Sequence, residues 1–372
     1  MNKIVEFIKK EVVLVIALLL GLVSSFVIPP SAEYVSYIDY RVLVLLFALM
    51  LVVAGLKSLG VFRLLGEKMC QKVKSIKGLS FVLMCLCFFS SMLITNDVAL
   101  ITFVPFTISV FAMIDCEDRL IPVIVLETIA ANLGSMLTPI GNPQNLLLFS
   151  VSGMSIGEFI LLMLPLTVVS FVLIAIGIFF MKNQQIQLKN TEKQQTGLLR
   201  DWHFWMYCVL FVVCLGNVFH LYSHWIVLLI IIVAILATNR KLFTEVDYSL
   251  LFTFIGFFIF IGNMKQVEAV NTWLSQMITG REMLTGILAS QVISNVPAAM
   301  LLSGFTTDYQ ELLYGVNIGG LGTLIASMAS LISYRFFVKA YPQAKQKYFV
   351  QFTVYNVVLL VIITGLTMLF LC

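Results

Sequence analysis

The sequence predicts an all-α polytopic membrane protein with two inverted-topology repeats, about nine full spans and two re-entrant hairpins. Three observations predict this fold class. Of the 372 residues, 60% are hydrophobic and 11% are charged, and apolar runs long enough to cross a bilayer recur along the chain. Short polar stretches interrupt some of these runs, and they occur twice in the same order. The basic residues fall mostly on one side of the resulting path.

The apolar runs define the spans in chain order. They lie at residues 11–29, 40–56, 79–114, 120–149, 158–181, 203–218, 225–238, 249–262, 283–305, 312–336 and 349–371. Two of the runs have a polar tip near their middle. We expect each of these two to be a hairpin that enters and leaves the membrane on the same side.

The duplication sets the predicted domain organisation. Residues 1–181 form the first repeat, with hairpin 79–114 and broken helix 120–149. Residues 182–224 form a cytoplasmic linker and a connecting span, and this odd span inverts the second repeat. Residues 225–372 form that second repeat, with hairpin 283–305 and broken helix 312–336. A weaker match between Asp39-Tyr40 and Asp247-Tyr248 supports the boundary.

The distribution of basic residues predicts the orientation. All but three of the 23 Lys and Arg residues fall on one side of the path, and the exceptions are Arg41, Lys265 and Arg281. The positive-inside rule places that side in the cytoplasm, with the N-terminus inside and the C-terminus outside. The first hairpin then opens to the cytoplasm and the second to the outside.

The two hairpin tips are the predicted substrate site. Thr95-Asn96-Asp97 and Ser294-Asn295-Val296 align with their asparagines 199 positions apart. Non-helical backbone at membrane depth must be buried in protein or face a wet cavity. Asparagine can offer a carbonyl oxygen to a cation and an amide to an anion. The predicted substrate-binding residues are Thr95, Asn96, Asp97, Ser294 and Asn295. Alternatively, the first tip only caps the helix after it.

The two broken helices are the predicted ion site. Residues 132–145 align with residues 317–330 at an offset of 185 positions. Prolines in the first stretch and glycines in the second interrupt the helix, so freed carbonyls can coordinate Na⁺ and half-helix N-termini can face an anion. The predicted ion-binding residues are Asn132, Gly134, Thr138, Asn142, Asn145, Asn317, Gly319, Thr323 and Ser327. The alternative is that the Gly-rich stretches are helix-packing faces.

Two acidic residues lie inside predicted membrane segments. A charged carboxylate inside the membrane costs free energy, so an acidic residue there is by default taken as functional. Asp97 and Glu127 are therefore the predicted proton or cation coupling residues. Glu127 has an alternative, because it could pair with Arg119 or lie close to the cytoplasmic surface.

The remaining motifs do not indicate an enzyme. Gly153-Met-Ser155-Ile-Gly157 matches a hydrolase nucleophile pattern, but Ser155 followed by Glu158 is a helix capping box. The seven cysteines form no C-x-x-C motif, and the three histidines lie away from both polar clusters. We expect no metal site and no cofactor apart from Na⁺ as a coupling ion. The net charge of +4 does not indicate nucleic acid as a partner.

The motifs also carry a family resemblance. The stretch 130–146 and the tip 294–298 resemble the signatures of the ion transporter superfamily, which includes arsenite permeases, citrate permeases, sodium/proton antiporters and divalent-anion/sodium symporters. The chain is most similar to the small bacterial anion permeases of this group. The resemblance implies a homodimer in the bacterial cytoplasmic (inner) membrane, with a transport domain that moves against a scaffold in an elevator-like motion.

The sequence thus predicts a secondary active transporter of a small anion or oxyanion, coupled to Na⁺ or H⁺. Asp97 and Val296 depart from the Ser-Asn-Thr tips that the resemblance implies, which argues against a dicarboxylate substrate. A sodium/proton antiporter and an arsenite efflux permease are the alternatives within transport. A membrane enzyme would need a nucleophile and base that the sequence lacks. An ion channel is disfavoured because inverted repeats favour alternating access.

Overall fold

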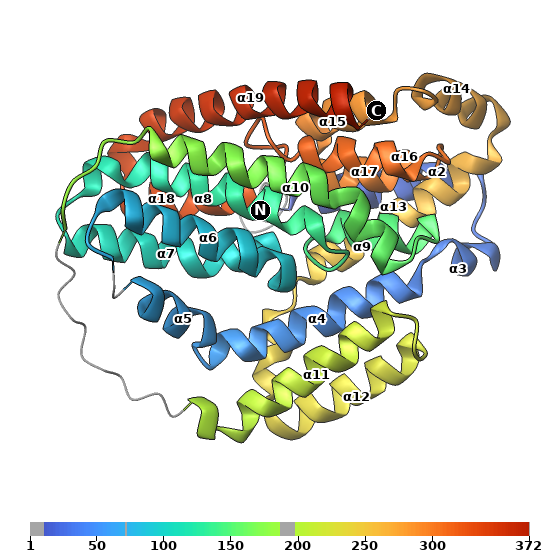
Figure 1. Cartoon of the computed structure of the whole chain (residues 1–372). Coiled ribbons are helices and arrows are strands. Elements are labelled where there is room, and N and C mark those ends of the chain that lie inside the picture. The colour runs from blue at the N-terminus through green and yellow to red at the C-terminus, as the bar shows by residue number, and fades with distance from the viewer. Residues whose placement is uncertain (1–10, 71–72, 187–197, 372) are drawn as a thin grey trace.

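The computed structural model describes residues 11–70, 73–186 and 198–371. The elements in these ranges are helices, apart from one isolated β-bridge between Ser75 and Gln185 (Figure 1). Seven of the described helical segments are long and apolar enough to span a membrane. The predicted all-α polytopic class is therefore confirmed.

The helices of the first half follow the predicted apolar runs. Their bounds are α2 (Val12–Val27), α3 (Glu33–Tyr37), α4 (Tyr40–Ser58), α5 (Val61–Cys70), α6 (Ile76–Ile94), α7 (Asn96–Met113), α8 (Leu120–Gly134), α9 (Pro143–Ser152) and α10 (Ile156–Phe179). Short 3₁₀ turns at Glu117–Arg119 and Ser135–Leu137 flank α8.

The second half continues in the same way. Its helices are α11 (Trp202–Val218), α12 (His224–Thr238), α13 (Tyr248–Gln266), α14 (Glu268–Ile278), α15 (Glu282–Ile293), α16 (Asn295–Ser303), α17 (Tyr309–Ile318), α18 (Met328–Ala340) and α19 (Lys345–Phe370). The apolar runs do not predict α3, α5 or α14, because these helices are short and α5 and α14 mix polar with apolar residues.

The helices form two groups in space. In Figure 1, α4, α11 and α12 run side by side below a larger bundle that contains α6–α10 and α15–α19. Small residues allow close helix contacts, as is usual in membranes. A Cβ on Gly55 of α4 would lie only 2.4 Å from the Tyr207 ring of α11, and one on Gly256 of α13 would lie 2.9 Å from the Ala17 backbone of α2.

One pair of aligned helices, α4 in the first repeat and α13 in the second, starts with the same cap. Asp39 accepts a hydrogen bond from the Val42 N–H at 3.1 Å, and Asp247 accepts one from the Leu250 N–H at 2.9 Å. These bonds satisfy N–H groups that the first turns of α4 and α13 leave free. The hairpins α6–α7 and α15–α16 point into the bundle from opposite ends in Figure 1. That arrangement is expected of inverted repeats, whose orientation in a membrane stays a prediction.

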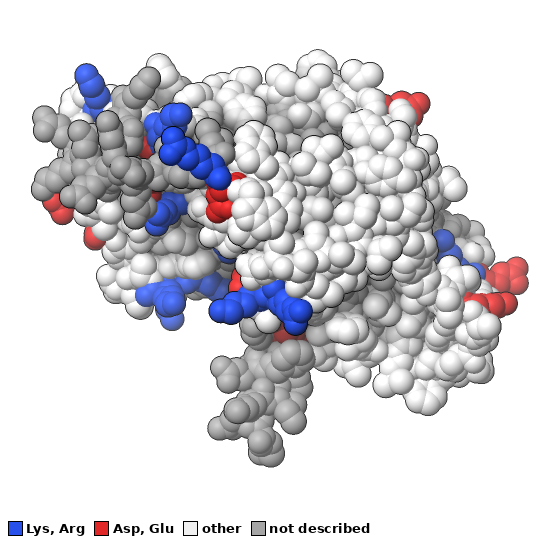
Figure 2. All heavy atoms as spheres, turned by 90° about the horizontal axis from the view of Figure 1, so that it is seen from below, with Lys and Arg blue, Asp and Glu red and all other residues white. Residues whose placement is uncertain are grey.

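Charged side chains gather toward the ends of the molecule. Figure 2 shows most of the visible Lys and Arg side chains toward one end, beside a broad face without charges. In the lower group, Val209, Val212 and Leu229 are more than half exposed, as lipid-facing residues would be.

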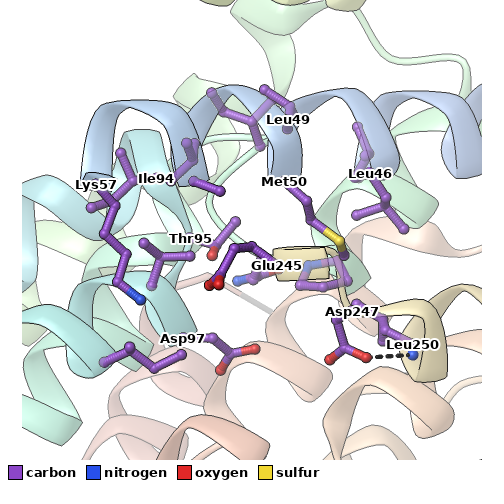
Figure 3. A pocket seen from close by; sticks show the side chains of 18 of the residues that line it. Leu46, Leu49, Met50, Lys57, Ile94, Thr95, Asp97, Glu245, Asp247 and Leu250 are labelled. Atoms are coloured by element: carbon purple, nitrogen blue, oxygen red, sulfur yellow. Dashed lines mark hydrogen bonds between the residues drawn. The ribbon is translucent and has the colours of Figure 1, made fainter. Parts of the chain in front are cut away.

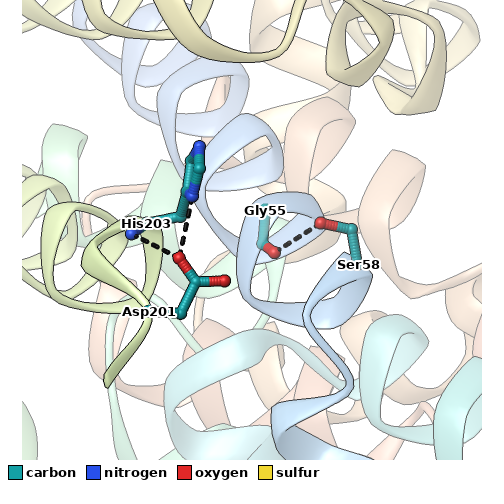
Figure 4. A network of polar contacts seen from close by, with 4 residues as sticks. All are labelled: Gly55, Ser58, Asp201 and His203. Atoms are coloured by element: carbon teal, nitrogen blue, oxygen red, sulfur yellow. Dashed lines mark hydrogen bonds and ion pairs between the residues drawn. The ribbon is translucent and has the colours of Figure 1, made fainter. Parts of the chain in front are cut away.

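The start of α11 holds a local polar network. Asp201 accepts hydrogen bonds from the backbone N–H of His203 at 2.9 Å and from its ring Nδ1 at 2.8 Å (Figure 4). Both bonds lower the pKa of Asp201, and the bond from the backbone N–H has the larger effect. Nearby, the Ser58 hydroxyl donates to the Gly55 carbonyl at 2.7 Å and closes the last turn of α4. The contact between Asp201 and His203 therefore caps the start of α11.

Candidate functional site

The two hairpin tips have the same backbone conformation. Thr95 has φ 72° and ψ 152°, and Ser294 has φ 73° and ψ 153°. A positive φ is unfavourable for residues other than glycine, and most of all for a β-branched residue such as threonine. Both residues separate two helices, and α7 and α16 begin at the aligned Asn96 and Asn295. The same strained turn therefore occurs at the two aligned positions.

Each tip is bonded to the unwound loop of its own repeat in the same way. The N–H of Asn96 donates to the Gly141 carbonyl at 3.1 Å, and the N–H of Asn295 donates to the Ala326 carbonyl at 2.9 Å. The two acceptors are 185 positions apart, as the alignment of the broken helices requires. The match of donors and acceptors supports the duplication.

A further pair of bonds repeats this pattern. The Thr138 hydroxyl donates to the Met92 carbonyl, and the Thr323 hydroxyl donates to the Gln291 carbonyl at 3.2 Å. The two predicted ion-binding threonines therefore fasten each loop to the first helix of its hairpin.

The two broken helices are joined to each other by a buried polar network. Asn132 Oδ1 accepts from the Ser327 hydroxyl at 3.0 Å, and Asn317 Oδ1 accepts from Asn142 Nδ2 at 3.2 Å. These two bonds are equivalent under the 185-residue offset. A second equivalent pair joins Asn317 to Asn145 at 2.8 Å and Asn132 to Ser330 at 3.4 Å.

The network also reaches both tips. Asn96 Nδ2 donates to Asn132 Oδ1 at 3.0 Å, and Asn132 Nδ2 lies 3.5 Å from the Gly320 carbonyl. A Cβ on Gly320 would lie 3.0 Å from Asn295 Nδ2. The structure therefore brings Asn96, Asn132 and Asn295 to the same place between the two repeats.

Two of the predicted ion-binding residues are packing positions. A Cβ on Gly134 would lie 2.2 Å from the Phe88 carbonyl oxygen, and one on Gly319 would lie 2.7 Å from the Ser290 hydroxyl. Each glycine lets a broken helix touch the first helix of its hairpin. For these two residues the contacts favour the alternative of a helix-packing face.

A cavity of about 220 Å³ lies beside the first tip (Figure 3). Thr95, Asp97 and Asn142 line it, together with one face of α4 that contains Leu46, Leu49, Met50, Val53, Ala54 and Lys57. Glu245 and Asp247, just before α13, complete the charged lining. Figure 3 shows the carboxylates of Asp97 and Asp247 directed toward one another. The cavity lining thus contains three carboxylates and one ammonium group.

The sequence does not predict Lys57, Glu245 or Asp247 as site residues. Each lies at the end of a predicted span, where charged residues are common for reasons unrelated to a ligand. The weak match between Asp39 and Asp247 singles out Asp247 only as the start of a repeat.

Glu127 lies elsewhere in the bundle. Its side chain is fully buried, and its Oε1 accepts a hydrogen bond from the Thr107 hydroxyl at 2.5 Å. Arg119 pairs with its neighbour Asp118 at 2.9 Å. Glu127 and Arg119 form no ion pair, so that alternative is wrong, whereas the distance of Glu127 from the cytoplasmic surface of a membrane stays a prediction.

The comparison with known proteins decides the family. A family model described as a citrate transporter matches residues 4–308. The chain belongs to the citrate transporter family. This agrees with the resemblance to the ion transporter superfamily, and it makes the protein a membrane transporter and not an enzyme.

Two relatives cover most of the chain and a third covers part of it. A protein of Methanocaldococcus jannaschii described as an uncharacterized transporter is 35% identical over 309 residues, which are 82% of each chain. The inner membrane protein YbiR of Escherichia coli is 33% identical over 325 residues, which are 86% of each chain. A silicon efflux transporter of Oryza sativa subsp. japonica is 35% identical over 139 residues, which are 37% of this chain and 28% of that protein.

Proposed function

We propose that this transporter moves a small anion or oxyanion by secondary active transport coupled to H⁺ or Na⁺. The observation that carries the proposal is Asp97, whose carboxylate lines the cavity next to the tip. An uncompensated carboxylate at an anion site would repel the substrate, and it is costly to keep charged at membrane depth. A mobile cation that binds at Asp97 removes both problems and couples the two fluxes.

The proposed substrate residues are the two tips, with the buried network of the broken helices as their support. Asn96 and Asn295 approach Asn132 and Gly320 from opposite repeats. Their amides are suitable donors for an oxyanion, and the loop carbonyls are suitable ligands for Na⁺. Ion binding by Thr138, Asn142, Asn145, Thr323 and Ser327 stays part of this proposal.

We also propose how the chain works in the membrane. The group α4, α11 and α12 is the proposed scaffold, and the larger bundle is the proposed moving domain of a homodimer. The proposed location is a bacterial cytoplasmic membrane, with the N-terminus inside and the C-terminus outside. The repeats 1–181 and 225–372 then provide the two alternating access paths.

The charge of the cavity favours a second candidate, a sodium/proton antiporter or an efflux permease for arsenite or another weak acid. The three carboxylates outnumber Lys57, so the cavity suits a cation or an uncharged acid better than an anion. The rice relative is described as a silicon efflux transporter, which supports a weak acid as the substrate class to test.

Reconstitution into proteoliposomes tests these proposals. Carboxylates, sulfate, phosphate, arsenite and silicic acid are each supplied with and without Na⁺ and pH gradients. The leading proposal expects saturable flux of one anion that requires one of the two gradients. Na⁺ flux against a pH gradient without any added solute would favour the antiporter. Flux that neither saturates nor responds to a gradient would contradict secondary transport altogether.

A further inference from the structure

A second cluster of polar side chains lies inside the helix bundle, and it is separate from the residues that line the cavity. Glu127 of α8 and Tyr348 of α19 are both fully buried. They interact electrostatically with one another. Thr107 of α7 donates its hydroxyl to Glu127, and the adjacent Thr128 bonds Ser333 of α18 at 2.8 Å. Four helices therefore meet at this cluster.

Two oxygen atoms of the cluster lack a hydrogen-bond partner. They are Oε2 of Glu127 and the hydroxyl oxygen of Tyr348. Buried polar atoms are nearly always paired, so each unpaired atom needs an explanation. Burial of an ionised carboxylate with a single hydrogen bond is strongly unfavourable. A neutral carboxylic acid in the same place costs much less.

The surroundings of Glu127 supply no compensating charge. In the described part of the chain, no Lys, Arg or His forms an ion pair with it. The titratable or hydroxyl-bearing groups that face it come from five helices. They are Cys70 on α5, Cys87 on α6, Thr107 on α7, Tyr348 on α19 and, through Thr128, Ser333 on α18. None of these groups is a cation.

The cluster is mechanically connected to the central network. Glu127 and Asn132 lie five residues apart on α8. Asn132 bonds Ser327 and Ser330, which lie just before and in the first turn of α18, and Thr128 bonds Ser333 one turn later. A change in the charge of Glu127 would therefore act on the packing of α8 against α7, α18 and α19, next to the predicted substrate residues.

We propose that Glu127 is a proton-binding site of this transporter, separate from Asp97 and enclosed in the helix bundle. In the conformation seen here, the unpartnered Oε2 carries the proton. Release of this proton leaves a carboxylate that the cluster cannot compensate, so it requires the helices around it to separate. The proposal rests on H⁺ as the coupling ion of the proposed function.

Infrared spectroscopy of the whole protein in lipid vesicles, titrated with H⁺, tests the site without any substrate. The carbonyl stretch of a protonated carboxyl group should be present at neutral pH and lost as the pH rises. Glu127→Gln should abolish this band, and Tyr348→Phe and Thr107→Val should shift it. Glu158→Gln is the matched control, because Glu158 is an exposed capping residue of α10 whose loss should leave the band in place.

Two spectroscopic results would overturn the proposal. One is the absence of the Glu127 band at neutral pH, which would mean an ionised carboxylate. The other is a band that persists at every pH at which the protein stays folded, which would mean a purely structural acid. A transport assay then distinguishes failure of this inference from failure of the proposed function. If the proteoliposomes transport no solute while the infrared band titrates with pH, only the proposed function fails. If Glu127→Gln transports with the wild-type pH profile, the role in coupling fails.

Discussion

The two repeats share their geometry and differ in their chemistry. The tips at Thr95 and Ser294 have nearly identical dihedral angles, and the N–H after each bonds a matched carbonyl. The residue after the asparagine is Asp97 in the first tip and Val296 in the second. Asp97 lines a charged cavity, whereas Val296 is buried. The two tips thus share a turn conformation, and only the first carries a charge.

The two unwound loops are also supported differently. In the first, the Asn145 side chain donates to the carbonyls of Met136 and Thr138, both at 3.1 Å. In the second, the Gln291 side chain donates to the carbonyls of Gly319 and Leu321 and accepts from the Thr323 N–H at 2.9 Å. Gln291 aligns with Met92, which offers no such bonds from its side chain. Both loops are bonded to their hairpins, but the first has additional side-chain support from within and the second has additional side-chain support from its hairpin.

The largest effect is expected from removal of either tip asparagine. Asn96→Ala leaves the buried Asn132 oxygen with one donor fewer, and Asn295→Ala removes the matched amide from the other repeat. The lost Asn96 bond costs about 1–3 kcal/mol in the network, and either change removes a proposed substrate ligand. We expect either variant to abolish transport in proteoliposomes while folded protein remains in the membrane.

The control for this pair is Asn356→Ala, because Asn356 is a buried asparagine of α19 whose amide bonds the Phe352 carbonyl of its own helix. It should retain most of the transport activity. Near-normal transport by Asn96→Ala or Asn295→Ala at saturating substrate would contradict the site assignment.

The orientation of the repeats can be tested by an all-or-none labelling experiment. Glu117→Cys lies just after the first hairpin, and Asp308→Cys lies just after the second. In a cysteine-free background, a membrane-impermeant thiol reagent should label position 308 from outside and position 117 only after the membrane is opened. Labelling of both from the same face would remove the inversion, and with it the comparison of two access paths.

Gln291→Ala should have an intermediate effect on stability. The side chain makes three bonds to the backbone of the second loop, each with a net contribution of about 1 kcal/mol, so the loss should be about 2–3 kcal/mol. Met92→Ala at the aligned position is the matched control and should lose only apolar contacts. Thermal unfolding in detergent measures both. Equal shifts in Tm for the two variants would show that the loops are not supported differently.

The sequence predicts the elements that depend on local pattern. Apolar runs locate the long helices, and polar interruptions locate both tips and both breaks, because these patterns are contiguous in the chain. The helices α5 and α14 are missed because an amphipathic stretch of about ten residues lacks the signal of a membrane span. The pattern also places Asn132 and Asn317 among the site residues, but it cannot show that they bond across the two repeats.

The cavity depends on tertiary structure and is harder to predict. Lys57, Asp97 and Asp247 come from distant parts of the sequence, and two of them are at span ends, where charge has an ordinary explanation. The Arg119 alternative for Glu127 fails for a similar reason. The sequence spacing allows the pair, but the structure gives Arg119 a closer carboxylate in Asp118.

The smallest effect on transport is expected from a change at Asp97, the charged residue of the first tip that aligns with Val296 of the second. Asp97→Asn keeps the size of the side chain and mimics its protonated form. If Asp97 carries the coupling cation, the variant should retain substrate binding, because the amide can still donate to an anion, but the dependence of transport on pH or Na⁺ should become flat. Asp247→Asn is the matched control from the facing wall of the cavity, and it should alter that dependence less, because Asp247 also caps α13 and is exposed to solvent. Transport by Asp97→Asn with unchanged pH and Na⁺ dependence would reduce Asp97 to a helix cap. The coupling cation would then have to bind in the unwound loops around Asn132 and Asn317, which bond each other's repeat.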